Sequence, residues 1–145
     1  MRRLSTFALA AFSLSLLMFA APAAHAAITG HIDADITHPF TIVNTTLPPG
    51  HYVFRMEPAT DLQIMTLTNA SGDTSVAFMV RPLIDNHVPK HSELVFNRYG
   101  HREFLEKIFE MGHKTGVAVI EPSHEEAQLR KEGQKPFEHT EEQQH

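Results

Sequence analysis

The sequence contains no cysteine among its 145 residues. This absence excludes disulfide bonds, thiolate metal ligands and cysteine nucleophiles. It also excludes the lipid anchor of bacterial lipoproteins, which is attached to a cysteine at the cleavage point. A domain without disulfides depends on its hydrophobic core for stability.

Basic residues are also scarce. Lysine and arginine number 12 against 17 aspartate and glutamate residues, and the formal net charge at pH 7 is −5. A nucleic-acid-binding domain is expected to carry a face rich in lysine and arginine, so this balance argues against a nucleic-acid partner. It likewise gives no reason to expect attraction to anionic lipid surfaces.

Familiar catalytic motifs are absent as well. The sequence has no P-loop, no dinucleotide fingerprint, no G-x-S-x-G and no H-E-x-x-H. Asp33 and Asp35 resemble a carboxylate pair, but they share one face of an expected strand and lack the two contrasting environments that glycosidase chemistry needs. The sequence therefore favours a non-catalytic protein, and an unrecognised hydrolase is the least favoured alternative.

One long apolar run stands near the start of the chain. The pair RR at positions 2–3 precedes an apolar stretch over residues 4–20, and AHA at 24–26 matches a small-residue cleavage site, which is the pattern of a secretory signal peptide. An uncleaved membrane anchor is the alternative, because the run is nearly long enough to cross a bilayer. We expect cleavage after Ala26, a secreted or periplasmic protein, and no stable membrane insertion once the signal is removed.

Alternation of apolar and polar side chains dominates most of the remaining chain. In HIDADI (31–36) the histidine and both aspartates point one way and the apolar residues the other, as in a half-buried strand. Further strands are predicted in PFTIVNTTL (39–47), HYVFRME (51–57), DLQIMTLTN (61–69), TSVAFMV (74–80), SELVFNRYG (92–100) and GVAVI (116–120).

Glycine and proline mark the turns between these segments. The PPGH step (48–51) suits a type II turn with Gly50 at positive φ, after which a strand begins at His51. The ASGD segment (70–73) predicts a hairpin in which the glycine needs conformational freedom. The RPLIDNHVPKHS segment (81–92) contains two prolines and is expected to be a loop of about ten residues.

Two later segments have different patterns. REFLEKIFEMG (102–112) fits an amphipathic helix as well as a strand, and the turn-like YGH before it favours the strand. Further on, Ser123 suits a helix N-cap with Glu126 completing a capping box, and Gly133 suits the helix end.

The sequence therefore predicts an all-β, mostly antiparallel fold, a small barrel or sandwich of about seven strands with a short C-terminal helix. We expect residues 1–26 to be a signal peptide, residues 27–133 a single β-rich domain, and residues 134–145 a disordered polar tail. His139 and His145 lie in this tail and imply no structured site.

Two segments resemble a group of small secreted bacterial proteins of unknown function. The pattern F-x-[IV]-x-N-x-x-L-P-x-G-x-Y corresponds to Phe40 through Tyr52, and L-V-F-x-R-Y-G corresponds to Leu94 through Gly100. The resemblance covers most of the exported domain and implies a β-rich fold, with a strand rather than a helix after Gly100. It implies no catalytic residues.

Histidine is the compositional outlier, with 11 residues, and neutral imidazole binds Zn²⁺, Cu²⁺ and Ni²⁺. His31 and Asp33 share a strand face with a spacing that suits one ion, provided that a neighbouring strand supplies further ligands. His87 and His91 form a second candidate group with His101 if the long loop folds over the turn that contains His101. Both groups also have a simpler interpretation as solvated surface residues.

Arg98 and Tyr99 form a candidate ligand-binding pair at the end of a strand. An arginine beside aromatic residues can bind a carboxylate or stack on a ring. The alternative is an arginine that bridges its own hairpin to Glu103 or Glu106. We assign Val95 and Tyr99 to the inner face of this strand and Arg98 to the opposite face.

The sequence thus supports an exported, non-catalytic β-domain that binds an unknown protein or small-molecule ligand or serves structurally. The alternative is a histidine-based metal-binding protein. The sequence implies no cofactor beyond a divalent transition metal ion.

Overall fold

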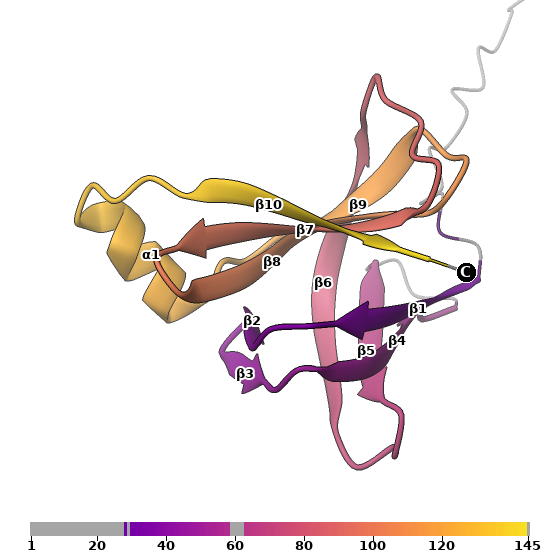
Figure 1. Ribbon diagram of the computed structural model, residues 1–145, viewed down its shortest axis with the longest axis horizontal. Coiled ribbons are helices and arrows are strands. Elements are labelled where there is room, and N and C mark those ends of the chain that lie inside the picture. The colour runs from indigo at the N-terminus through magenta and orange to yellow at the C-terminus, as the bar shows by residue number, and fades with distance from the viewer. Residues whose placement is uncertain (1–27, 29, 59–62, 145) are drawn as a thin grey trace, which may run out of the picture.

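The computed structural model describes residues 28, 30–58 and 63–144, and these residues form ten strands and one helix (Figure 1). The strands are β1 (His31–Ile36), β2 (Phe40–Ile42), β3 (Thr45–Leu47), β4 (Gly50–Met56), β5 (Ile64–Asn69), β6 (Ser75–Ile84), β7 (Ser92–Tyr99), β8 (Arg102–Phe109), β9 (Thr115–Val119) and β10 (Phe137–Gln143), and helix α1 spans His124–Lys131. The all-β, mostly antiparallel class predicted from the sequence is confirmed. The predicted signal peptide, residues 1–26, lies outside the described residues.

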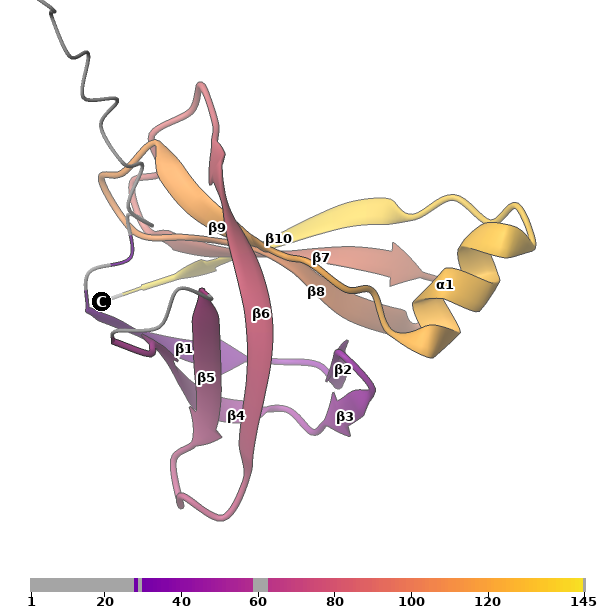
Figure 2. The same cartoon turned by 180° about the vertical axis from the view of Figure 1, so that it is seen from behind.

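The strands form a mixed, mostly antiparallel sheet that bends into two layers. One layer contains β1, β4, β5 and part of β6, and the other contains the rest of β6 with β9, β8, β7 and β10 (Figure 2). Strand β6 belongs to both layers, because its residues 75–79 pair with β5 and its residues 80–84 pair with β9. The short β2–β3 hairpin joins the second layer through parallel pairing of β2 with β8.

Within the described part of the chain, β1 and β10 share no backbone ladder, so the sheet is not a closed barrel. Side chains link these two edges instead. The Asp35 amide donates to Gln143 Oε1 over 2.7 Å, and Thr37 Oγ1 donates to Glu141 Oε1 over 2.8 Å. We call this meeting of two edges the β1–β10 seam.

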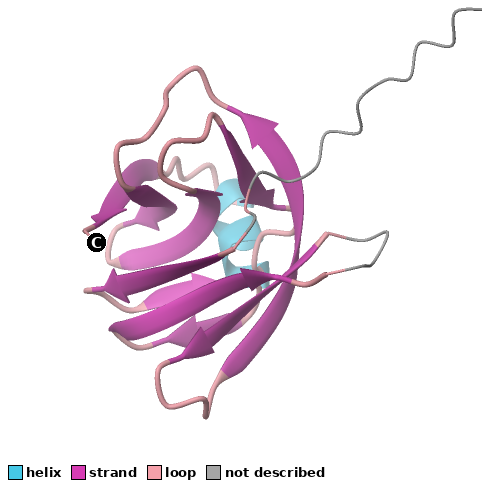
Figure 3. Ribbon diagram, turned by 90° about the vertical axis from the view of Figure 1, so that its right-hand side faces the viewer, coloured by secondary structure: helices cyan, strands magenta, loops and turns pink. Residues whose placement is uncertain are grey.

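The two layers of strands face each other across the core (Figure 3). Large apolar side chains from both layers fill the space between them. Phe54, Met65 and Leu67 contribute from the first layer, and Phe96 and Ile108 contribute from the second, each with an exposed fraction of 0%. Each such side chain stabilises the fold by roughly 1.5–3 kcal/mol relative to an exposed position. The alternation in β1 is confirmed, because Ile32, Ala34 and Ile36 are buried in this core.

Several local predictions are confirmed. Gly72 and Gly100 have φ angles of 79° and 64°, as their hairpin turns require. The segment after Gly100 is strand β8 rather than a helix. Helix α1 begins as predicted, since Ser123 Oγ accepts from the Glu126 amide over 3.0 Å.

The predicted disordered tail is wrong for residues 137–143, which form β10 and pair with β7 along seven residues. The polar composition concealed this strand, because its side chains are mostly exposed and its backbone bonds are made to the edge of β7. The β-rich domain therefore continues past residue 133.

Three smaller predictions are also wrong. Segment 39–47 is a hairpin rather than one strand, since Val43 takes a φ of 54° and turns the chain. Gly50 does not take a positive φ but begins β4, and Tyr52 Oη closes the corner by donating to the Pro48 carbonyl over 2.6 Å. Residues 81–84 belong to β6 instead of a loop, because β9 pairs with them.

No helix in the described part of the chain is long and apolar enough to span a membrane.

Candidate metal centre

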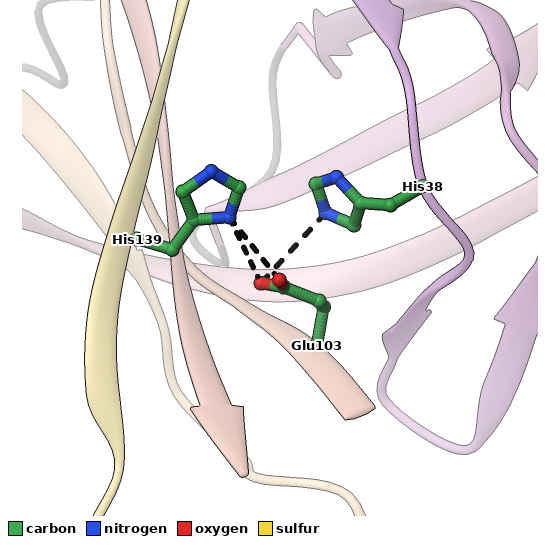
Figure 4. Close-up of side chains that lie close together, drawn as sticks. All are labelled: His38, Glu103 and His139. Carbon is green, nitrogen blue, oxygen red and sulfur yellow. Dashed lines mark hydrogen bonds and ion pairs between the residues drawn. The ribbon is translucent and has the colours of Figure 1, made fainter. Parts of the chain in front are cut away.

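Three potential metal ligands from distant parts of the chain converge beside the β1–β10 seam (Figure 4). His38 lies in the link between β1 and β2, Glu103 is the second residue of β8, and His139 lies in β10. Strand β7 lies between β10 and β8, and these two pairings bring His139 and Glu103 close together on the side of the sheet that faces the core. In the described residues, this is the one group of at least three histidine or acidic side chains whose donor atoms all lie within 4.8 Å of one another.

The distances in this cluster leave little space between the donor atoms. His139 Nδ1 lies 3.2 Å from each oxygen of the Glu103 carboxylate, and His38 Nε2 lies 3.8 Å from Glu103 Oε2. The carboxylate is deeply buried, with 4% of its side chain exposed, while His38 and His139 are 18% and 25% exposed. The cluster therefore combines a buried anion with two partly exposed imidazoles.

The His38 ring is held in one orientation by its neighbours. Its Nδ1 lies 3.0 Å from Glu141 Oε1, and its edge packs on Phe96 with the ring centroids 4.9 Å apart. A carboxylate on the Nδ1 side orients the ring, as in many metal-binding histidines. His38 Nε2 is buried and has no hydrogen-bond partner. This nitrogen is therefore oriented and free to bind a cation.

Arg98 supplies positive charge on the other side of the cluster. Its Nη2 lies 2.8 Å from His139 Nδ1, and its Nε makes an ion pair with Glu103. The predicted bridge from Arg98 to Glu103 within their hairpin is thus confirmed. Because 38% of the Arg98 side chain is exposed, the guanidinium can turn into solvent without crossing the core.

The structure separates the two residues of the predicted ligand-binding pair. Arg98 shares the core-facing side of β7 with Leu94 and Phe96, so the assignment of inner and outer faces is reversed for the main core. Tyr99 points to the opposite side and is buried in a second cluster with Phe104 and Leu129, under helix α1. Tyr99 is buried on this side because helix α1 packs against it, and the alternation of residues along the strand does not predict that contact.

The predicted loop group also stays apart. His87 and His91 lie in the loop before β7, whereas His101 lies in the turn after it. Strand β7 has eight residues, and at the usual rise per residue it separates the two ends by roughly 25 Å. The structure does not bring these three histidines together.

The predicted pair His31 and Asp33 does make contact. His31 Nε2 lies 3.2 Å from Asp33 Oδ2 on the exposed face of β1, and β4 adds His51 Nε2 at 3.5 Å from Asp33 Oδ1. The neighbouring strand that the sequence interpretation required is β4.

His51 also provides a test of the electrostatics on this face. Its pKa is raised above the ordinary value of 6.5, chiefly by its hydrogen bond to Asp35. A raised pKa in the folded state means that His51 stabilises the fold at low pH, and that this contribution is lost as the pH rises through the raised value. We expect Asp35→Asn to lower the His51 pKa, as measured by NMR titration of the imidazole resonances.

The matched control for this titration is Asp85→Asn, which removes an aspartate outside the set that raises the His51 pKa. An unchanged His51 pKa in the Asp35 variant, or an equal drop in the Asp85 variant, would contradict the assignment of the cause.

Sequence reasoning missed His38 entirely and placed His139 in a disordered tail. One signal for His139 was present, because residues 137, 139, 141 and 143 share a face if the tail is a strand. No local pattern marked His38, since its partners come from β8 and β10 far along the chain.

No protein-family model, curated protein or solved structure matches this chain. The resemblance of residues 40–52 and 94–100 to small secreted bacterial proteins therefore stays a prediction.

Proposed function

We propose that this protein is an exported, non-catalytic metal-binding protein that holds a divalent transition metal ion, Zn²⁺ or Cu²⁺, between His38, Glu103 and His139. The observation that carries the proposal is the buried Nε2 of His38, which faces Glu103 and has no hydrogen-bond partner. A buried polar atom without a partner is costly, and a bound cation at this position removes that cost.

The donor set fits this class of ion. Two imidazole nitrogens and one carboxylate oxygen suit zinc and copper, whereas magnesium and calcium prefer oxygen ligands. Ligand bonds of about 2.0–2.1 Å in a tetrahedral site place neighbouring donor atoms about 3.3 Å apart. The His139–Glu103 distance of 3.2 Å matches this value, and the His38–Glu103 distance of 3.8 Å needs only a small contraction.

Glu141 supports the site from outside. Its Oε1 contacts His38 Nδ1 and also accepts from Thr37 Oγ1 over 2.8 Å. Carboxylate partners of this kind orient ligating histidines and raise their basicity. The support for export is the sequence pattern of residues 2–26.

Arg98 favours a second candidate function, a purely structural one. Arg98 pairs with Glu103 and donates to His139 Nδ1, so the three side chains form a polar network that fastens β10 to β7 and β8. In this alternative the domain has a structural or protein-binding role and the cluster only stabilises the sheet. A metal ion and the Arg98 guanidinium compete for the same carboxylate, so the two functions predict opposite effects of removing Arg98.

Calorimetric titration of the full chain with Zn²⁺ and with Cu²⁺ tests the proposal. Replacement of a ligand by Glu103→Gln or His38→Gln is expected to weaken binding at least about tenfold. Arg98→Met is expected to strengthen it about tenfold, because a positive charge within a few ångströms of the ion is removed.

Two control variants are matched to these changes. Glu106→Gln removes a glutamate from the same strand β8 without touching the cluster, and the double variant His87→Gln/His91→Gln removes two loop histidines. Both are expected to leave the cluster's affinity unchanged. The metal site would be rejected by weaker binding in Arg98→Met or by unchanged binding in Glu103→Gln. The structural network predicts instead that the melting temperature falls in both variants and that added metal does not change it.

A further inference from the structure

A second group of histidines and carboxylates lies on the outside of the first layer, away from the cluster at the seam. It consists of His31, Asp33 and Asp35 from β1 and His51 from β4, and we call it the outer-face ladder. The antiparallel register pairs Asp35 directly with His51. Alternation along β1 turns its three members away from the core, so all four side chains share one exposed face.

Asp33 occupies the centre of the outer-face ladder. Its two oxygens face two different rings, with Oδ2 at 3.2 Å from His31 Nε2 and Oδ1 at 3.5 Å from His51 Nε2. Both distances are close to the separation of about 3.3 Å between neighbouring donors around a tetrahedral zinc ion.

His51 is oriented in the same way as His38 in the buried cluster. Its Nδ1 lies 2.9 Å from Asp35 Oδ1, which leaves Nε2 directed at Asp33. The chain thus repeats one arrangement, in which a carboxylate holds the Nδ1 side of an imidazole and Nε2 faces another carboxylate. Such outer carboxylates orient the ring for metal binding.

We propose that His31, Asp33 and His51 form a second site for a divalent transition metal ion, with Asp35 as the partner that orients His51. The three donor groups do not all lie within 4.8 Å of one another, so one ring turns toward the other when the ion binds. The exposed fractions of the His31 and His51 side chains, 55% and 41%, leave both rings free to make this movement. The site stands on its own residues and does not depend on the buried cluster.

The solvent exposure of these side chains is expected to lower the affinity of the second site. Ordering of two mobile rings costs conformational entropy, and solvent screens the attraction between the ion and the carboxylates. We therefore expect weaker binding here than at the buried cluster. Arg55 pairs with His31 across β1 and β4, but in the described residues no ion pair or hydrogen bond joins its guanidinium to these donors. Arg98 contacts the buried cluster instead, so Arg98→Met is expected to leave this site unchanged.

The experiment is a titration of the full-length Glu103→Gln variant with Zn²⁺ and Cu²⁺, since that change weakens the buried site and leaves the outer-face ladder intact. The expected result is one remaining ion per chain, with shifts of the His31 and His51 imidazole resonances in NMR spectra of the Zn²⁺ titration. Asp33→Asn in this background is expected to abolish the remaining binding, and Asp35→Asn to weaken it about tenfold.

The matched control is His87→Gln in the same background. This change removes an exposed histidine that also faces a carboxylate, at 3.7 Å from Glu93, and it is expected to have no effect. The second site would be overturned if Glu103→Gln bound no ion, or if adding Asp33→Asn left the remaining binding unchanged. It would also be overturned if His87→Gln reduced the binding as much as Asp33→Asn does. The wild-type chain and His38→Gln report separately on the buried cluster, so the two sites fail independently.

Discussion

Ending the chain at Gly133 is expected to lower the free energy of unfolding by several kcal/mol, out of the roughly 5–15 kcal/mol that a domain of this size has. The removed segment contains β10, which pairs with β7 over seven residue positions. Its loss exposes the edge of β7 and uncovers Phe96, which has an exposed fraction of 0% in the complete chain. Chemical denaturation with fluorescence or circular dichroism detection measures the change.

The control for this truncation is a chain that ends at Gln143 and keeps all of β10. It is expected to be as stable as the complete chain, because the last seam contact, between the Asp35 amide and Gln143 Oε1, is retained. A chain ending at Gly133 that melts within about 2 °C of the complete one would show that the tail contributes nothing, as its polar composition had suggested.

The second large effect is expected from Gly116→Ala in β9. An added Cβ would lie 2.5 Å from the Ile108 carbonyl oxygen and 2.5 Å from a ring carbon of Phe109. Strand β9 pairs with β6 on one side and β8 on the other, so the backbone has no room to retreat. We expect a loss of about 3 kcal/mol, at the upper end for an overpacked site, and a fall of about 10 °C in the melting temperature measured by calorimetry.

Gly50→Ala is the matched control for this substitution. Gly50 also lies in a strand, and its added Cβ would meet Tyr52 at 3.7 Å, an ordinary contact distance. The control is expected to change the melting temperature little. Equal effects of the two substitutions would show that the close approach at Gly116 does not determine stability.

The two candidate metal sites differ in what they contribute to the fold. The buried cluster joins β10 to the link after β1 and so crosses the seam where the sheet lacks a ladder. An ion bound there would connect the two free edges, and metal binding would then stabilise the whole domain through linkage. The outer-face ladder lies on strands already paired with each other, so binding there is expected to stabilise the fold far less.

The sequence alone was sufficient wherever short-range geometry decides the outcome. Alternation in HIDADI identified the exposed and buried faces of β1, because side chains in a strand change sides at every residue. The turn at Gly100 and the cap at Ser123 were likewise recognisable, since both depend on the conformational needs of a few adjacent residues.

Only the tertiary structure decided the rest. Strand β10 has few apolar residues, and it is a strand because β7 offers an edge with unpaired backbone groups, which no local pattern reports. His38, Glu103 and His139 meet because three different strand pairings bring them to one end of the core, and their separation along the chain hides that meeting. His51 joins Asp33 for the same reason, since the register between β1 and β4 is a property of the sheet and not of either strand.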